Sequence, residues 1–184
     1  MIMSIKPKYA QAIIDGVKLY EYRKTVPKKH DVKKLYVYAS KPIKGIVARF
    51  IIKRVICDTP QKVWELTHEH GGISEAEFFD YFRGRDKAYA LQIENVLKFD
   101  MPIDPKTIFN GFTAPQNYVY IEDNEELKRE ERIAKKLEKN DKEFLDFLSE
   151  AKEGKVGLIR DILEKSEKAV RNRKKLMNSI GEDV

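Results

Sequence analysis

Three charged side chains close together near the N-terminus are the residues best suited to chemistry in this sequence. Lys18, Glu21 and Arg23 fall within the segment GVKLYEYR. Side chains alternate between the two faces of an extended strand, so we expect Glu21 and Arg23 on one face and Tyr20 and Tyr22 on the other. A carboxylate beside two cations accepts and donates hydrogen bonds, which suits a planar polar ligand such as a nucleobase. The alternative is a structural ion pair at the mouth of a barrel, and the residues alone favour that alternative.

Other catalytic and metal-binding patterns do not occur in the sequence. The three histidines, His30, His68 and His70, form no ligand set, and His68 and His70 are too close in sequence to share one side of a helix. A lone cysteine, Cys57, excludes an internal disulfide and a thiolate zinc cage. No Walker loop, GxGxxG or GxSxG motif is present. We therefore expect no cofactor and no bound metal.

Positive charge is concentrated in the first third of the chain. The net charge is +6, yet residues 1–54 hold 14 Lys and Arg against three acidic residues, a net +11. A concentrated positive field attracts polyanions, and the tyrosines of this segment are able to stack on bases. We expect RNA or a nucleotide as the partner, with a basic loop along its phosphates: Lys28, Lys29, Lys33 and Lys34. A basic surface that serves only solubility is the alternative.

The patterning of residues 1–122 predicts short strands interrupted by helices. Strands are expected at residues 2–6, 18–24, 35–40, 45–57, 87–99 and 116–121. Helices are expected at residues 9–15, 60–70 and 74–82, the last opened by a Ser74/Glu77 capping box. Residues 100–115, which contain three prolines, are expected to form a loop. The arrangement predicts an α+β domain built on a small, mainly antiparallel β-barrel.

The composition changes after Glu122. Residues 123–184 lack proline and are rich in good helix formers, which predicts two helices, at about 124–152 and 156–179. We interpret residues 123–184 as a charged helical extension of a domain at 1–122. This extension could pair with itself, dock a protein partner or fold back on the barrel. No apolar stretch is long enough to span a membrane and no secretory signal is evident, so a cytoplasmic location is expected.

The charged cluster also carries a resemblance to a known family. Gly16, Lys18, Glu21 and Arg23 reproduce the GxKxxExR signature of the ASCH domain, a member of the PUA-like superfamily. Further segments of residues 3–121 resemble archaeal-type members in the same order: SIKP at 4–7, YVYAS at 36–40, the stretch 64–91 and APQ at 114–116. The resemblance does not cover the extension after Glu122.

The resemblance implies a PUA-like β-barrel with flanking short helices and a cleft at one side. It places RNA or a modified base in a cleft lined by the signature residues and three looser neighbours: Lys18, Glu21, Arg23, Lys6, Ser40 and Gln116. The leading hypothesis is an RNA-binding module without catalysis, in RNA metabolism or in transcriptional or translational regulation.

Two other classes of function are carried as alternatives. The first is a small hydrolase of a modified nucleoside, or a ribonuclease, with Lys18 as the activating base or charge stabiliser and Glu21 as the proton-transfer group. Similar bacterial ASCH proteins hydrolyse an acetylated cytidine with a Thr three residues after the Lys, a position that Glu21 occupies here. The second is an interaction protein that docks a partner or oligomerises through residues 123–184.

Overall fold

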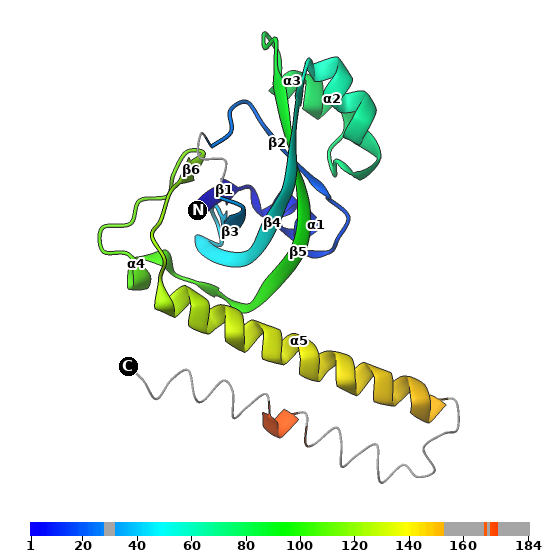
Figure 1. The fold of residues 1–184 in the computed structure, drawn as a ribbon, viewed down its shortest axis with the longest axis vertical. Helices are drawn as coiled ribbons and strands as arrows, with labels where there is room; N and C mark the ends of the chain where they lie inside the picture. Colours follow the sequence, from blue (N-terminus) through cyan, green and yellow to red (C-terminus); the bar gives the residue numbers. More distant parts are fainter. Residues whose placement is uncertain (28–31, 153–167, 169, 173–184) are drawn as a thin grey trace. The chain divides into compact units, whose positions relative to one another are not determined.

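The computed structural model describes residues 1–27, 32–152, 168 and 170–172. The chain divides into two compact units, Met1–Asn124 and Glu125–Val184. The first unit contains one mixed sheet of six strands in the order β2-β5-β4-β3-β1-β6. Its strands are β1 (Ile2–Ile5), β2 (Tyr20–Arg23), β3 (Lys34–Ala39), β4 (Gly45–Asp58), β5 (Ala88–Ile103) and β6 (Tyr118–Val119). The sheet curls into a half-barrel (Figure 1).

Strand pairing explains the curl. β1 runs parallel to β3, and the other neighbours in the sheet are antiparallel. β4 and β5 are long, and their register shifts at three places, where the two strands bend together. The sheet therefore wraps around its own core, and the predicted α+β, PUA-like barrel fold is confirmed.

The short helices begin where the sequence supplies caps. α1 (Pro7–Ile14) and α2 (Pro60–Thr67) each start with proline at the first helical position. A 3₁₀ turn (His68–His70) follows α2. α3 (Glu75–Tyr81) opens with the predicted capping box, in which the side chains of Ser74 and Glu77 and their backbones bond reciprocally.

The prediction of a loop at residues 100–115 is wrong in its first half. β5 continues to Ile103, which pairs with Ile46 near the start of β4. A further helix, α4 (Pro105–Ile108), follows, and the side chain of Asp104 accepts a hydrogen bond from the Lys106 backbone at its start. The extra strand length comes from pairing with a distant segment, which local composition does not reveal.

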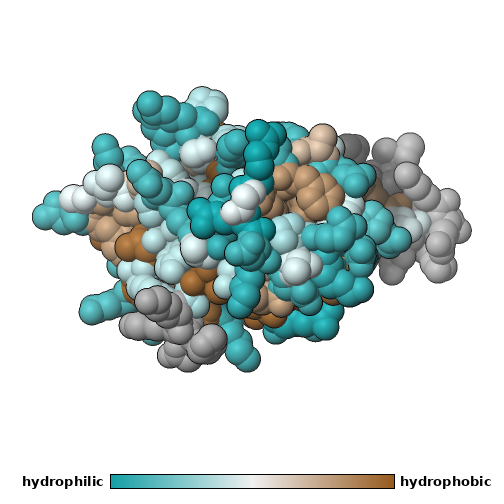
Figure 2. Space-filling model, turned by 90° about the horizontal axis from the view of Figure 1, so that it is seen from above, coloured by the Kyte–Doolittle hydropathy of each residue, from teal (hydrophilic) through white to brown (hydrophobic). Residues whose placement is uncertain are grey.

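Two apolar clusters support the sheet. One fills the half-barrel and includes Met3, Ile13, Val37, Phe50 and Leu91. The other packs α2 and α3 on the opposite end of the β4–β5 ribbon through Tyr22, Val63, Phe78, Phe82 and Ala90. Seen from this α2–α3 end, the surface is mostly hydrophilic, with apolar atoms in small separate areas (Figure 2).

The second unit contains α5 (Glu125–Lys152). Four apolar side chains along this helix are buried: Leu127, Ile133, Ala134 and Leu137. The helix predicted at 156–179 lies almost entirely outside the described residues. Two expectations stay predictions. They are the separation of the chain into a domain at 1–122 and an extension at 123–184, and self-association through that extension. Among the described residues, no helix is long and apolar enough to cross a membrane.

Candidate functional site

A pocket of about 590 Å³ opens on the first unit where segments distant in sequence meet. The end of β1, α1, β2, the end of β3, α3 and residues 114–116 contribute to it. Its walls carry four tyrosines and six charged side chains: Tyr9, Tyr22, Tyr38, Tyr81, Lys6, Lys18, Glu21, Arg23, Glu77 and Asp80. The volume and the mixed lining are typical of a site for a small planar ligand.

Lys18 is the most deeply buried charged group of the pocket, with only 2% of its surface exposed. Its Nζ donates a hydrogen bond to the carbonyl oxygen of Gly71 at 2.6 Å and lies 3.7 Å from Glu21 Oε2. The rings of Tyr9 and Tyr22 lie 5.3 and 4.6 Å from the same nitrogen. An ammonium has three N–H donors, and the described residues accept from one of them. Donors therefore remain for a ligand.

The environment of Lys18 changes its acidity. Burial lowers the pKa of Lys18 below its ordinary value, the Glu21 carboxylate opposes this change, and the Arg23 guanidinium adds to it. A lysine with a lowered pKa in a pocket is a mark of functional sites.

Glu21 and Arg23 form a buried ion pair, with Glu21 Oε1 2.9 Å from Arg23 Nη2. Arg23 also donates to the carbonyl oxygen of Ser4 at 2.7 Å and to Asn117 Oδ1 at 3.0 Å. The guanidinium therefore ties β2 to β1 and to the segment that leads into β6. Among the side chains that the structure describes, Glu21 Oε2 has a single polar contact, with Lys18 Nζ at 3.7 Å. This is beyond hydrogen-bond distance, so the oxygen is available as an acceptor.

The chain reverses direction sharply before β2, and this turn positions Lys18. Gly16 adopts a left-handed φ of +71° directly after α1, as the sequence predicts for a residue that ends a helix. The backbone N–H groups of Val17 and Lys18 both donate to the carbonyl of Ala12. Leu19 then donates to the carbonyl of His70, which joins the start of β2 to the turn after α2.

Gly71 packs so closely on Tyr22 that the structure leaves no room for a side chain. A Cβ at Gly71 would overlap the Tyr22 hydroxyl and lie 3.0 Å from two of its ring carbons. The φ of Gly71 is −76°, a value that any residue adopts, so the restriction is purely steric. Because Gly71 also accepts the hydrogen bond from Lys18, this contact couples the ammonium to the tyrosine.

We expect Gly71→Ala to lower the free energy of unfolding by about 1–3 kcal/mol, the usual cost of overpacking a tight site. Without the overlap, the same change would raise stability by about 0.4–1 kcal/mol, so the sign is informative. Urea denaturation of the full chain measures it. In a Tyr22→Phe background, which lacks the overlapping hydroxyl, the cost should shrink. An equal cost in both backgrounds would contradict the assigned contact.

The structure brings together six of the residues predicted from the sequence. Lys18, Glu21 and Arg23 line the pocket, as do Lys6, Ser40 and Gln116. Tyr22, expected on the face opposite Glu21, also contributes to the lining and packs edge-on against Phe78.

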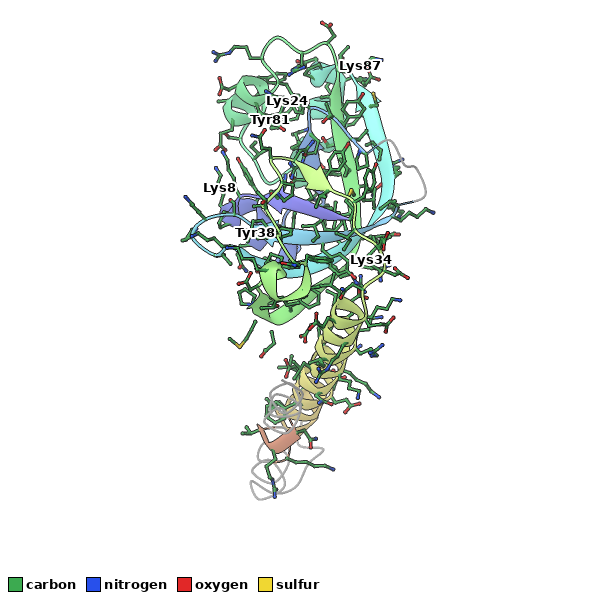
Figure 3. The ribbon with its side chains drawn as sticks, turned by 90° about the vertical axis from the view of Figure 1, so that its left-hand side faces the viewer. Lys8, Lys24, Lys34, Tyr38, Tyr81 and Lys87 are labelled. Atoms are coloured by element: carbon green, nitrogen blue, oxygen red, sulfur yellow. The ribbon has the colours of Figure 1, made fainter. Side chains whose placement is uncertain are left out.

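The predicted basic loop is not part of this pocket. Lys28 and Lys29 lie outside the described residues. Lys33 is exposed, and Lys34 begins β3, whose other end reaches Ser40 in the pocket wall. Four residues of strand, about 13 Å, separate Lys34 from Tyr38, which also lines the pocket. Lys34 also lies far from Lys24 and Tyr81 in Figure 3. The binding of nucleic acid by these lysines stays a prediction.

Sequence reasoning did not identify the contribution of α3. Glu77, Asp80 and Tyr81 of this helix line the pocket, and Asn117 fixes Arg23 from the opposite side. The spacing of Glu77, Asp80 and Tyr81 places them on adjacent turns of one helix, but only the docking of α3 on β2 shows that they face the signature residues.

The histidines and the cysteine lie elsewhere. His68 and His70 are exposed on the turn after α2, His30 lies outside the described residues, and Cys57 is an exposed free thiol near the end of β4. Within the described part of the chain, no group of three or more His, Cys, Asp or Glu side chains is placed to hold a metal ion.

A curled mixed sheet with this signature in a lateral pocket defines an ASCH domain of PUA-like fold. The chain belongs to the family described as a domain of unknown function, DUF365, whose sequence model matches residues 1–120. It is 26% identical over 133 residues to an ASCH domain-containing ribonuclease of Zymomonas mobilis, which covers 69% of this chain and 87% of that protein. It is 29% identical over 122 residues to large ribosomal subunit protein uL22 of Ureaplasma parvum, but spans only 39% of that protein.

The fold has a solved counterpart. The crystal structure of ASCH from Zymomonas mobilis superposes with a TM-score of 0.64 at 24% identity, covering 69% of this chain and 90% of that one. At this identity the likeness establishes the fold.

Proposed function

We propose that this protein is an RNA-binding module whose pocket receives one nucleobase or nucleotide. The observation that carries the proposal is the juxtaposition of Lys18 Nζ and Glu21 Oε2, 3.7 Å apart on one pocket wall. The ammonium donates and the carboxylate accepts, which complements the donor and acceptor groups on the edge of a base. Burial of both side chains strengthens these hydrogen bonds, because competing water is scarce.

The aromatic lining supports the same proposal. Tyr9, Tyr22, Tyr38 and Tyr81 surround the pocket, and aromatic rings stack on bases regardless of sequence. RNA is read mainly through unstacked bases, which a pocket of this size accommodates. The relative named as an ASCH domain-containing ribonuclease also favours an RNA-related role.

Fluorescence anisotropy of a labelled single-stranded RNA decamer, titrated with the full chain at several KCl concentrations, tests the proposal. We expect saturable binding whose logarithmic affinity falls linearly with the logarithm of the salt concentration. Nucleosides, which lack phosphate, should displace the RNA by occupying the pocket. Absence of binding at low salt for RNAs of every base composition would overturn the proposal.

A second candidate is RNA cleavage or hydrolysis of a modified nucleoside in the same pocket. The lowered pKa of Lys18 and the similarity to the Zymomonas mobilis protein named as a ribonuclease favour it. Lys18 would stabilise developing negative charge and Glu21 would transfer a proton. Labelled RNA and acetylated cytidine incubated with the full chain test this candidate. Turnover should disappear in Lys18→Met and persist in Lys33→Gln. If the chain binds the RNA or the acetylated cytidine but leaves it chemically unchanged, the hydrolase candidate is excluded.

A further inference from the structure

Cations at the mouth of the pocket fall into two groups. Lys8 is paired with Glu77 at 2.5 Å, and Arg83 is paired with Asp80 at 2.5 Å. The two acidic side chains that α3 contributes to the pocket are therefore neutralised by their own partners. Lys24 and Arg85, by contrast, form no ion pair with any residue in the described ranges. Lys24 and Arg85 therefore carry positive charge that no ion pair among the described residues compensates.

Tyr81 connects these two cations to the pocket. Its ring lines the pocket wall, and 38% of the residue is exposed. Lys24 Nζ lies 4.8 Å from the centre of the ring, and the two side chains lie together in Figure 3. The backbone N–H of Arg85 donates to the carbonyl oxygen of Phe82, the residue after Tyr81, so Arg85 lies at the end of the helix that carries the ring. Burial raises the pKa of Tyr81, and the charges of Arg23 and Arg85 oppose that rise.

The charges of this cluster are not used in ion pairs or hydrogen bonds within the described part of the chain. Arg85 is exposed on the short turn between α3 and β5, and Lys24 is half-buried just after β2. Neither side chain donates a hydrogen bond within the described part of the chain, whereas the two terminal nitrogens of Arg23, one residue before Lys24, donate to Asn117 and to Ser4 of β1. Two such cations beside an aromatic ring are a common arrangement for holding single-stranded nucleic acid.

We propose that Lys24, Tyr81 and Arg85 form a phosphate subsite beside the pocket, which binds the backbone of the nucleotide next to the one in the pocket. The inference rests on the proposed function and specifies its ligand as a single-stranded oligonucleotide rather than a free nucleoside. Single strands are required because a base enters the pocket only when it is unstacked. Phosphate contacts then supply affinity, and the Lys18–Glu21 wall supplies selectivity.

Salt titrations of RNA binding by single variants test the subsite. Each phosphate contact on a single strand contributes about 0.7 to the slope of log affinity against log salt. We expect Lys24→Gln and Arg85→Gln each to reduce the slope by about 0.7 and to weaken binding of the RNA decamer about fivefold at 0.1 M KCl. The difference should vanish toward 1 M KCl, and the affinity for a nucleoside should stay unchanged.

Lys53→Gln and Lys98→Gln are matched controls, because each removes the same charge from an exposed position on β4 or β5 that does not line the pocket. The control variants should leave the slope of log affinity against log salt unchanged. Lys24→Arg, which keeps the positive charge, should have the wild-type slope. Equal slope losses in the controls and in Lys24→Gln or Arg85→Gln would overturn the subsite, because net charge alone would then explain binding. A third outcome is that Lys18→Met weakens decamer binding whereas Lys24→Gln and Arg85→Gln do not. This result would overturn the subsite and leave the proposed function standing. Failure of the wild-type chain to bind any decamer would overturn both.

Discussion

Glu21→Gln is expected to lower the free energy of unfolding by about 3 kcal/mol, the lower end of the cost of breaking a buried ion pair. Glu21 is 6% exposed and is the counter-charge of two cations, at 2.9 Å from Arg23 and 3.7 Å from Lys18. Its neutral analogue leaves both cations facing each other away from water. Lys18 limits the cost by releasing its proton, since burial already lowers its pKa.

Urea denaturation of the full chain at neutral pH measures this effect. Glu65→Gln is the matched control, because Glu65 pairs with Lys62 at 3.1 Å on the exposed face of α2, where ion pairs contribute little. The same Glu21 variant should alter which base is preferred, since an amide both donates and accepts where a carboxylate only accepts. Equal stability of Glu21→Gln and the wild type would show that the three charges are not coupled.

Lys18→Met should weaken RNA binding and lower the free energy of unfolding by about 1–3 kcal/mol, because the buried Gly71 carbonyl loses its hydrogen-bond donor. Methionine fills the space of the lysine stem, and Glu21 keeps its ion pair with Arg23. Loss of one charge-assisted hydrogen bond, about 1.5–3 kcal/mol, corresponds to an affinity about 10- to 150-fold weaker. Anisotropy titrations at one salt concentration, together with urea denaturation, measure both properties. Unchanged affinity in this variant would remove Lys18 from the binding site.

The pH dependence provides an independent check on Lys18. Burial lowers the pKa of the folded-state amine below the ordinary value of 10.5, so between these two values the unfolded chain binds more protons than the folded chain. Stability relative to Lys18→Met should therefore rise with pH across this window. RNA affinity should fall across the same window as the ammonium loses its charge, and in Lys18→Met this component of the pH dependence should be absent.

Local signals in the sequence were sufficient to predict most of the elements around the site. The glycine after α1 and the alternation along β2 predict that Glu21 and Arg23 share a face, and the structure confirms that they pair. The capping box predicts the start of α3. These features depend on residues within one turn or one strand of each other, which is why they are readable from spacing alone.

The remaining parts of the site depend on contacts across the fold. Tyr81 reaches the pocket because α3 docks on β2, and Asn117 meets Arg23 across 94 residues of sequence. The length of β5 likewise follows from pairing with β4. A charge count predicts phosphate contacts on the basic loop, and this stays a prediction, but net charge along the sequence does not distinguish paired from unpaired cations. The structure makes that distinction at Lys8 and Lys24.

Side-chain NMR of the full chain during titration with a single-stranded RNA decamer tests the central claim most directly. If a nucleotide enters the pocket, the Lys18 Nζ signal and the ring signals of Tyr22 and Tyr81 should shift in proportion to saturation, while the side-chain signals of Lys33 and Lys34 remain in place. Shifts confined to Lys33 and Lys34, with Lys18 unchanged at saturating RNA, would contradict the claim that the pocket receives the nucleotide.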